Sequence, residues 1–101
     1  MIDKRIKFYE SFISEEDETI TLYFTGPKEL LGDNYPAAVS MEISIECPKD
    51  NICSACANVE ISPTMYDKEA DGYTDYDWRE ILLPADEIEA LIKLAKESGR
   101  M

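Results

Sequence analysis

Residues 37–46, with the sequence AAVSMEISIE, decide the fold predicted for this chain. Apolar side chains alternate there with polar or acidic ones, which is the period of a β-strand that buries one face. An apolar face opposite a wet, acidic face is typical of an antiparallel sheet covered on one side only. The predicted inward set is Val39, Met41, Ile43 and Ile45, and the outward set is Ser40, Glu42, Ser44 and Glu46.

Other segments repeat this pattern and extend the predicted sheet. The apolar alternation of residues 5–13 and 18–25 predicts an antiparallel hairpin, and residues 57–62 add a further strand after residues 37–46. Residues 76–83 are a fifth candidate, whereas residues 63–75 are predicted to be a polar, acidic connection. The predicted inward side chains of the first three segments are Ile6, Phe8 and Phe12, then Ile20, Leu22 and Phe24, then Val59 and Ile61.

Residues 85–98 carry the predicted helix. Pro84 precedes it and Gly99 follows it, as expected at the two ends of a helix. Its apolar stripe needs a partner, and the apolar sheet face provides one. We therefore expect an α+β fold with a single domain, residues 1–101. It comprises an antiparallel sheet of four to five strands, one C-terminal helix packed on its apolar face, and a cysteine-bearing hairpin loop. The helical stripe consists of Ile88, Leu91, Ile92 and Ala95.

Charge and composition restrict the classes of function that the chain can have. The chain has 22 acidic and 10 basic residues, a net charge of −12, and no histidine. Direct binding to nucleic acid or to an anionic membrane is disfavoured, because both require clustered lysine and arginine. The lack of histidine removes the commonest general base and zinc ligand. We expect neither a signal peptide nor a membrane-spanning run, and three cysteines favour a reducing, cytoplasmic location.

All three cysteines lie within residues 47–56. Cys53 and Cys56 form a C-x-x-C pair, and Cys47 comes from the other arm of the same hairpin. This spacing predicts a structural Zn²⁺ site with three thiolates, which stabilises the hairpin tip. Asp50 is the predicted fourth ligand, with Glu46 and Asp67 as alternatives.

Other interpretations of the cysteines are open. The three thiols can be unconnected, or Cys47 and Cys56 can form a disulfide across the hairpin. A catalytic zinc site of the nucleobase-deaminase type is disfavoured. In those enzymes a proline precedes the C-x-x-C pair and a Glu motif lies upstream, whereas here Ile52 precedes the pair and no such motif is present. A cysteine-dependent enzyme would use Cys53 or Cys56 as its nucleophile, with Lys49 as the activating charge.

Residues 66–78 interleave acidic and aromatic side chains. Such a segment can be a solvated loop that packs on the sheet edge. It can also be a protein-binding surface, because Tyr and Trp provide contact area while carboxylates select a basic partner. Glutamates on the wet sheet face, Glu42, Glu46 and Glu60, would extend it. The predicted partner-binding residues are Tyr66, Asp67, Glu69, Asp71, Tyr73, Asp75, Tyr76 and Asp77.

In size, acidity and lack of catalytic residues, the chain resembles the small phage-borne anti-CRISPR proteins that inhibit Cas9. The resemblance concerns the whole chain and transfers no functional residue. It implies a non-enzymatic inhibitor in the bacterial host cytoplasm that mimics DNA. Its partner would be a basic surface of Cas9 or of its guide-RNA complex, where it would block guide or target-DNA loading. The alternative is a small phage or mobile-element accessory domain with a structural zinc site, whose acidity serves solubility.

Overall fold

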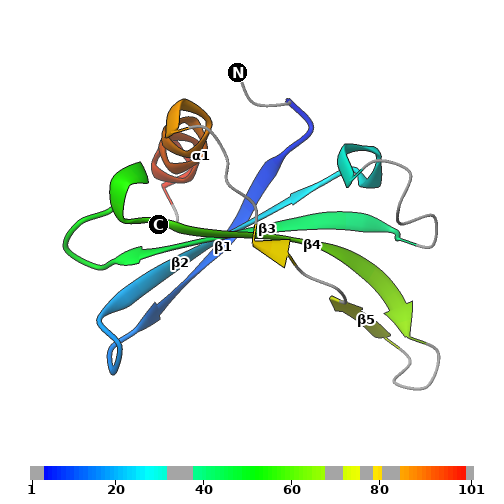
Figure 1. Ribbon diagram of the computed structural model, residues 1–101, viewed down its shortest axis with the longest axis horizontal. Coiled ribbons are helices and arrows are strands. Elements are labelled where there is room, and N and C mark those ends of the chain that lie inside the picture. The colour runs from blue at the N-terminus through cyan, green and yellow to red at the C-terminus, as the bar shows by residue number, and fades with distance from the viewer. Residues whose placement is uncertain (1–3, 32–37, 68–71, 76–78, 81–84, 100–101) are drawn as a thin grey trace.

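A single antiparallel sheet organises the computed structural model, which describes residues 4–31, 38–67, 72–75, 79–80 and 85–99 (Figure 1). The strands follow the order β1-β2-β3-β4-β5, and β6 pairs with β4 as well. Four long strands confirm the predicted sheet, and two short ones enlarge it. The elements are β1 (Lys7–Ser14), β2 (Thr19–Gly26), η1 (Lys28–Leu31), β3 (Ser40–Pro48), η2 (Ser54–Cys56), β4 (Asn58–Asp67), β5 (Gly72–Asp75), β6 (Arg79–Glu80) and α1 (Ala85–Glu97).

The predicted alternation of the two central strands is confirmed. Every second residue of β2 and β3 is buried, and the register places Leu22 opposite Ile45 and Phe24 opposite Ile43. We call the side of the sheet that carries these residues the inner face and the opposite side the outer face. Val39 departs from the prediction: it precedes β3 and is 51% exposed.

Strand β1 contains a bulge that reverses its predicted face. Phe8 pairs with Phe24 and Glu10 pairs with Tyr23, so Tyr9 is the extra residue of the bulge and has no Cα partner in the register of β2. After the bulge the alternation shifts by one residue, which turns every later side chain to the other face. Phe12, predicted to point inward, is therefore 62% exposed on the outer face.

Strand β4 is longer than predicted. It continues through Pro63 to Asp67 and forms a hairpin with β5, so residues 63–75 are not simply a connection. The Thr64 carbonyl points toward β3, where it accepts a hydrogen bond of 2.8 Å from the Val39 amide. The neighbouring Pro63 nitrogen consequently points to the other edge of β4. There it falls between Ile61, which pairs with β6, and Thr64, which pairs with β5.

The helix α1 covers the inner face, as predicted. Its buried residues are the predicted stripe, and they join the side chains of β1 to β4 in one core. Gly99 has a φ of +73°, and its amide donates to the Lys96 carbonyl, which confirms the predicted helix end. In Figure 1 the helix lies on one side of the sheet. Among the described residues no helix lies against the outer face. The buried stripe is Ile88, Leu91, Ile92 and Ala95.

Candidate functional site

The outer face gathers acidic and aromatic side chains from four strands. Tyr23 lies on β2, and its neighbours come from β1, β3 and β4. The described residues of β2, β3 and β4 that the register places on this face include charged side chains, and all of these are glutamates. Lys7, at the beginning of β1, is a basic residue on the same face. The outer-face set is Tyr9, Glu10, Phe12, Tyr23, Glu42, Glu46 and Glu60.

Contacts across the strands fix the two tyrosines of this face. The Tyr9 hydroxyl donates a hydrogen bond of 2.9 Å to Glu42 Oε2. The rings of Tyr9 and Tyr23 lie 6.1 Å apart, centroid to centroid, at an interplanar angle of 35°. Burial raises the pKa of Tyr23, and the negative charges of Glu42, Glu10, Glu46 and Glu60 raise it further. The same four charges that disfavour a tyrosinate would favour a cation or a basic side chain.

The raised pKa of Tyr23 predicts a loss of stability in alkali. Between pH 10.0, the usual value, and its raised folded pKa, tyrosine ionises in the unfolded chain but stays neutral in the folded one. The contribution of neutral Tyr23 to stability is therefore fully present below pH 10 and is lost as the pH rises through this window. Tyr23→Phe should weaken this decline, as measured by urea unfolding at several alkaline pH values. An unchanged decline would show that Tyr23 does not titrate in this environment.

The predicted partner-binding segment lies at the far end of β4. Its backbone forms the β4–β5 hairpin, with Tyr66 opposite Tyr73 and Asp67 opposite Gly72. Glu69, Asp71, Tyr76 and Asp77 lie outside the described residues. The role of this segment therefore stays a prediction, while the outer-face glutamates, which were expected only to extend it, form a surface of their own.

Cys47 belongs to the core. It continues the inward alternation of β3 and is 1% exposed, and its Sγ lies 3.8 Å from the Cys53 carbonyl oxygen, to which it donates. Burial raises the pKa of the Cys47 thiol, and the charges of Cys53 and Cys56 add to the effect. Cys47 is therefore packed as a residue of the core. Its position two residues after Ile45 was a signal for the core that the cysteine spacing obscured.

Cys53 and Cys56 lie side by side at the two ends of the η2 turn. The Cys56 amide donates to the Cys53 carbonyl at 3.3 Å, which closes the turn. Asn51 contacts both sulfurs: its Oδ1 accepts from Cys53 Sγ at 3.4 Å, and its Nδ2 donates to Cys56 Sγ at 3.2 Å. A hydrogen bond with the Cys53 thiol, followed by the charge of that group, raises the pKa of Cys56.

The fourth predicted zinc ligand lies in a different environment. Asp50 lines a surface depression together with residues of the β1–β2 turn, among them Asp17 and Glu18. Among the described residues, no three His, Cys, Asp or Glu side chains are grouped closely enough to hold a metal ion. The structure thus brings together two of the four predicted ligands, Cys53 and Cys56. Zinc binding stays a prediction.

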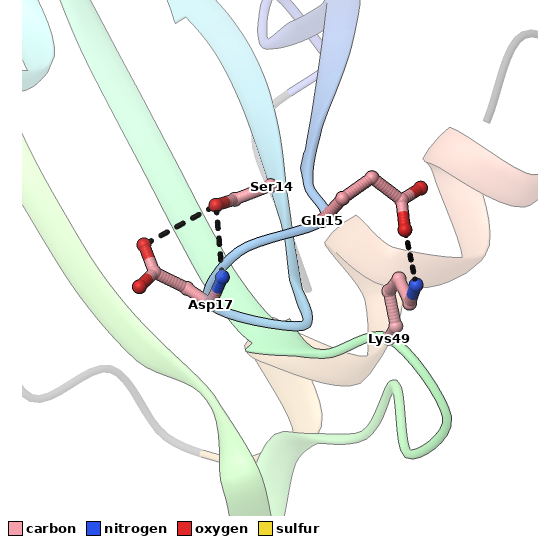
Figure 2. Close-up of polar contacts among 4 residues, drawn as sticks. All are labelled: Ser14, Glu15, Asp17 and Lys49. Atoms are coloured by element: carbon pink, nitrogen blue, oxygen red, sulfur yellow. Dashed lines mark hydrogen bonds and ion pairs between the residues drawn. The ribbon is translucent and has the colours of Figure 1, made fainter.

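Lys49 is engaged at the β1–β2 turn. Its Nζ forms an ion pair of 2.8 Å with Glu15 Oε2 (Figure 2). Its amide donates a hydrogen bond of 2.9 Å to the Glu18 carbonyl. Ser14 stabilises the same turn, because its hydroxyl contacts the Asp17 carboxylate at 3.2 Å and accepts from the Asp17 amide. The charge expected to activate a cysteine is therefore paired with a carboxylate.

Glu89 attaches the cysteine turn to the helix. Its Oε1 accepts a hydrogen bond of 2.8 Å from the Ser54 amide, between the two cysteines in sequence. This bond and a second one from the Ser54 hydroxyl lower the pKa of the Glu89 carboxyl. Because the folded pKa is below the usual 4.5, the contribution to stability is present at neutral pH and is lost as the solution is acidified through the folded pKa.

Removing this carboxylate should loosen the turn. In Glu89→Ala we expect the Ser54 amide to exchange its hydrogen several-fold faster at neutral pH, measured against the Ala95 amide of the buried helix face as internal reference. Glu89→Gln is the matched control, because it keeps an acceptor oxygen but has no charge to lose on acidification. Equal exchange in the wild type and in Glu89→Ala would mean that the bond does not hold the turn.

Comparisons with known proteins found no matching family model, no matching curated protein and no matching solved structure. Within the described part of the chain, no helix has the length and apolar character needed to cross a membrane.

Proposed function

We propose that this protein is a non-enzymatic, acidic inhibitor that binds a basic surface of a nucleic-acid-handling protein through its outer face. The observation that carries the proposal is the group of four glutamates around Tyr23, on the sheet face opposite α1. The class of partner with the matching chemistry is Cas9, alone or with its guide RNA, as the resemblance to anti-CRISPR proteins implies. Direct binding of nucleic acid is disfavoured by the net charge of −12.

The composition of the outer face suits such an interface. Its glutamates provide charge complementarity, which accelerates association with a basic partner and penalises acidic ones. Tyr9, Tyr23 and Phe12 add aromatic contact area at low entropic cost, and Phe12 is 62% exposed. Because the side chains stand on paired strands, little ordering is needed on binding. Carboxylates held in this way can take the places of nucleic-acid phosphates in a basic groove.

The test is a binding and cleavage assay with the full chain. We expect it to bind Cas9–guide RNA complex at low salt, to bind more weakly at about 0.15 M salt, and to reduce cleavage of target DNA in proportion to occupancy. Pre-loading Cas9 with target DNA should reduce the binding. No binding at low salt to Cas9 or to another basic nuclease would contradict the proposal and would favour the accessory domain whose acidity serves solubility.

The proposal includes a structural zinc site. Cys47, Cys53, Cys56 and Asp50 are the residues that would hold the ion, and the thiols would lose their protons on binding. The native mass with and without a chelator decides the question. A mass above that of the bare chain by one zinc ion, lost with the chelator, supports the site, and the bare mass in both samples contradicts it.

A further inference from the structure

The backbone of the η2 turn places Cys53 and Cys56 within reach of a disulfide bond. The hydrogen bond from the Cys56 amide to the Cys53 carbonyl joins residues three apart. In such a turn the first and fourth Cα atoms lie less than about 7 Å apart, and disulfides span Cα distances of about 4.4–6.8 Å. Side chains three apart also eclipse one another in this kind of turn. The pair can therefore be joined with little movement of the backbone.

The side chains are already held together. Asn51 contacts both sulfurs, at 3.4 Å from Cys53 and at 3.2 Å from Cys56. The side-chain amide of Asn51 thus holds the two thiols close to each other. All three cysteines are free thiols in the structure, so this arrangement is the reduced state of the pair.

Exposure separates this pair from the third cysteine. Cys56 is exposed and Cys53 is partly exposed, whereas Cys47 is 1% exposed in the core. A reagent in solution reaches the pair but not Cys47 in the folded chain. Oxidation should therefore be confined to the two residues that the turn joins.

We propose that Cys53 and Cys56 are a redox pair, oxidised reversibly by small-molecule disulfides such as oxidised glutathione. One protein thiolate attacks a sulfur of the oxidant, so that a mixed disulfide forms and one glutathione thiolate leaves. The second protein thiolate then attacks the protein sulfur of the mixed disulfide and displaces the second glutathione. The two protons lost by the protein are taken up by the two glutathione thiolates. In sum, the pair loses two electrons and two protons, and the oxidant becomes two glutathione molecules.

Oxidation would have two consequences beyond the turn. Ser54 lies inside the closed ring and bonds Glu89, so the disulfide would constrain the segment that contacts α1. The oxidised sulfurs also cannot bind Zn²⁺ as thiolates, so zinc binding and oxidation would exclude each other. This inference is independent of the inhibitor function, because neither cysteine belongs to the outer face.

The test equilibrates the full chain in glutathione buffers of increasing oxidised fraction, followed by alkylation under denaturing conditions and mass spectrometry. We expect the oxidised chain to lose the mass of two hydrogen atoms and to keep one of its three alkylatable thiols, with peptide mapping joining Cys53 to Cys56. Returning the sample to reduced glutathione should restore all three.

Single variants provide the controls. Cys47→Ala should still form the disulfide, whereas Cys53→Ser and Cys56→Ser should stop at a mixed disulfide with glutathione. Three results would overturn the proposal: a persistent mixed disulfide in the wild type, a bridge that includes Cys47, or thiols that react only after a chelator removes bound metal. The mass and the peptide map of the wild type, with and without a chelator, decide between them, so the outcome does not depend on the folding of any variant.

Discussion

Replacing Phe24 with alanine should lower the free energy of unfolding by about 3–5 kcal/mol. Phe24 has 0% of its surface exposed and lies on β2, between β1 and β3. Its ring contacts that of Phe8 edge to face, with the centroids 5.5 Å apart at an interplanar angle of 62°. Alanine would remove this contact and leave a cavity that paired strands cannot close, so the loss includes both the transfer and the cavity contributions.

The matched control for Phe24→Ala is Phe12→Ala. The same substitution on the outer face, at a side chain 62% exposed, should change the free energy of unfolding by no more than about 0.5 kcal/mol. Urea unfolding of the wild type and both variants measures the difference. Equal losses in the two variants would mean that Phe12 is buried and that the bulge at Tyr9 is absent.

Reversing two charges on the outer face should weaken binding to the basic partner by at least about tenfold, or about 1.4 kcal/mol. The variant is Glu46→Lys/Glu60→Lys, in which both side chains are exposed and lie on β3 and β4. Each substitution changes the charge by two, so the net charge rises from −12 to about −8. Most of the loss should lie in the association rate, and the salt dependence of binding should become shallower.

The control for this variant has the same net charge. Glu16→Lys/Glu97→Lys places the new lysines in the β1–β2 turn and at the end of α1, at exposed positions away from the outer face. Its dissociation constant should stay close to that of the wild type, as surface plasmon resonance at low salt can measure. If both variants lose affinity equally, the attraction to the partner depends on the net charge of the chain and not on the glutamates of the outer face.

Periodicity was sufficient for the parts of the fold where one face is buried along a whole element. The alternation of residues 19–25 in β2 and 40–46 in β3 and the stripe of α1 were predicted residue by residue, because burial on one side requires a period of two in a strand and of 3.6 in a helix. Cys47, which continues the buried alternation of β3, was not part of that prediction. The bulge could not be predicted, because Phe8, Tyr9 and Phe12 are all apolar enough for either face. Only the pairing with β2 shows which of them is the extra residue.

The candidate site was harder to predict than the fold. Pro63 indicated the end of a strand, but β4 continues through it to Asp67. The spacing of the cysteines indicated a common ligand set, although Cys47 continues the buried alternation of β3. The glutamates around Tyr23 stand at positions 10, 42, 46 and 60 of the chain, and only the strand register brings them to one surface.

The most direct test of the outer face as the binding surface is carboxylate footprinting of the free and the partner-bound chain, read by mass spectrometry. We predict that Glu42, Glu46 and Glu60 become protected on binding, while Glu16 and Glu97 are labelled as in the free protein. Protection confined to α1, or to the acidic segment 67–77 with the outer-face glutamates still labelled, would contradict this account.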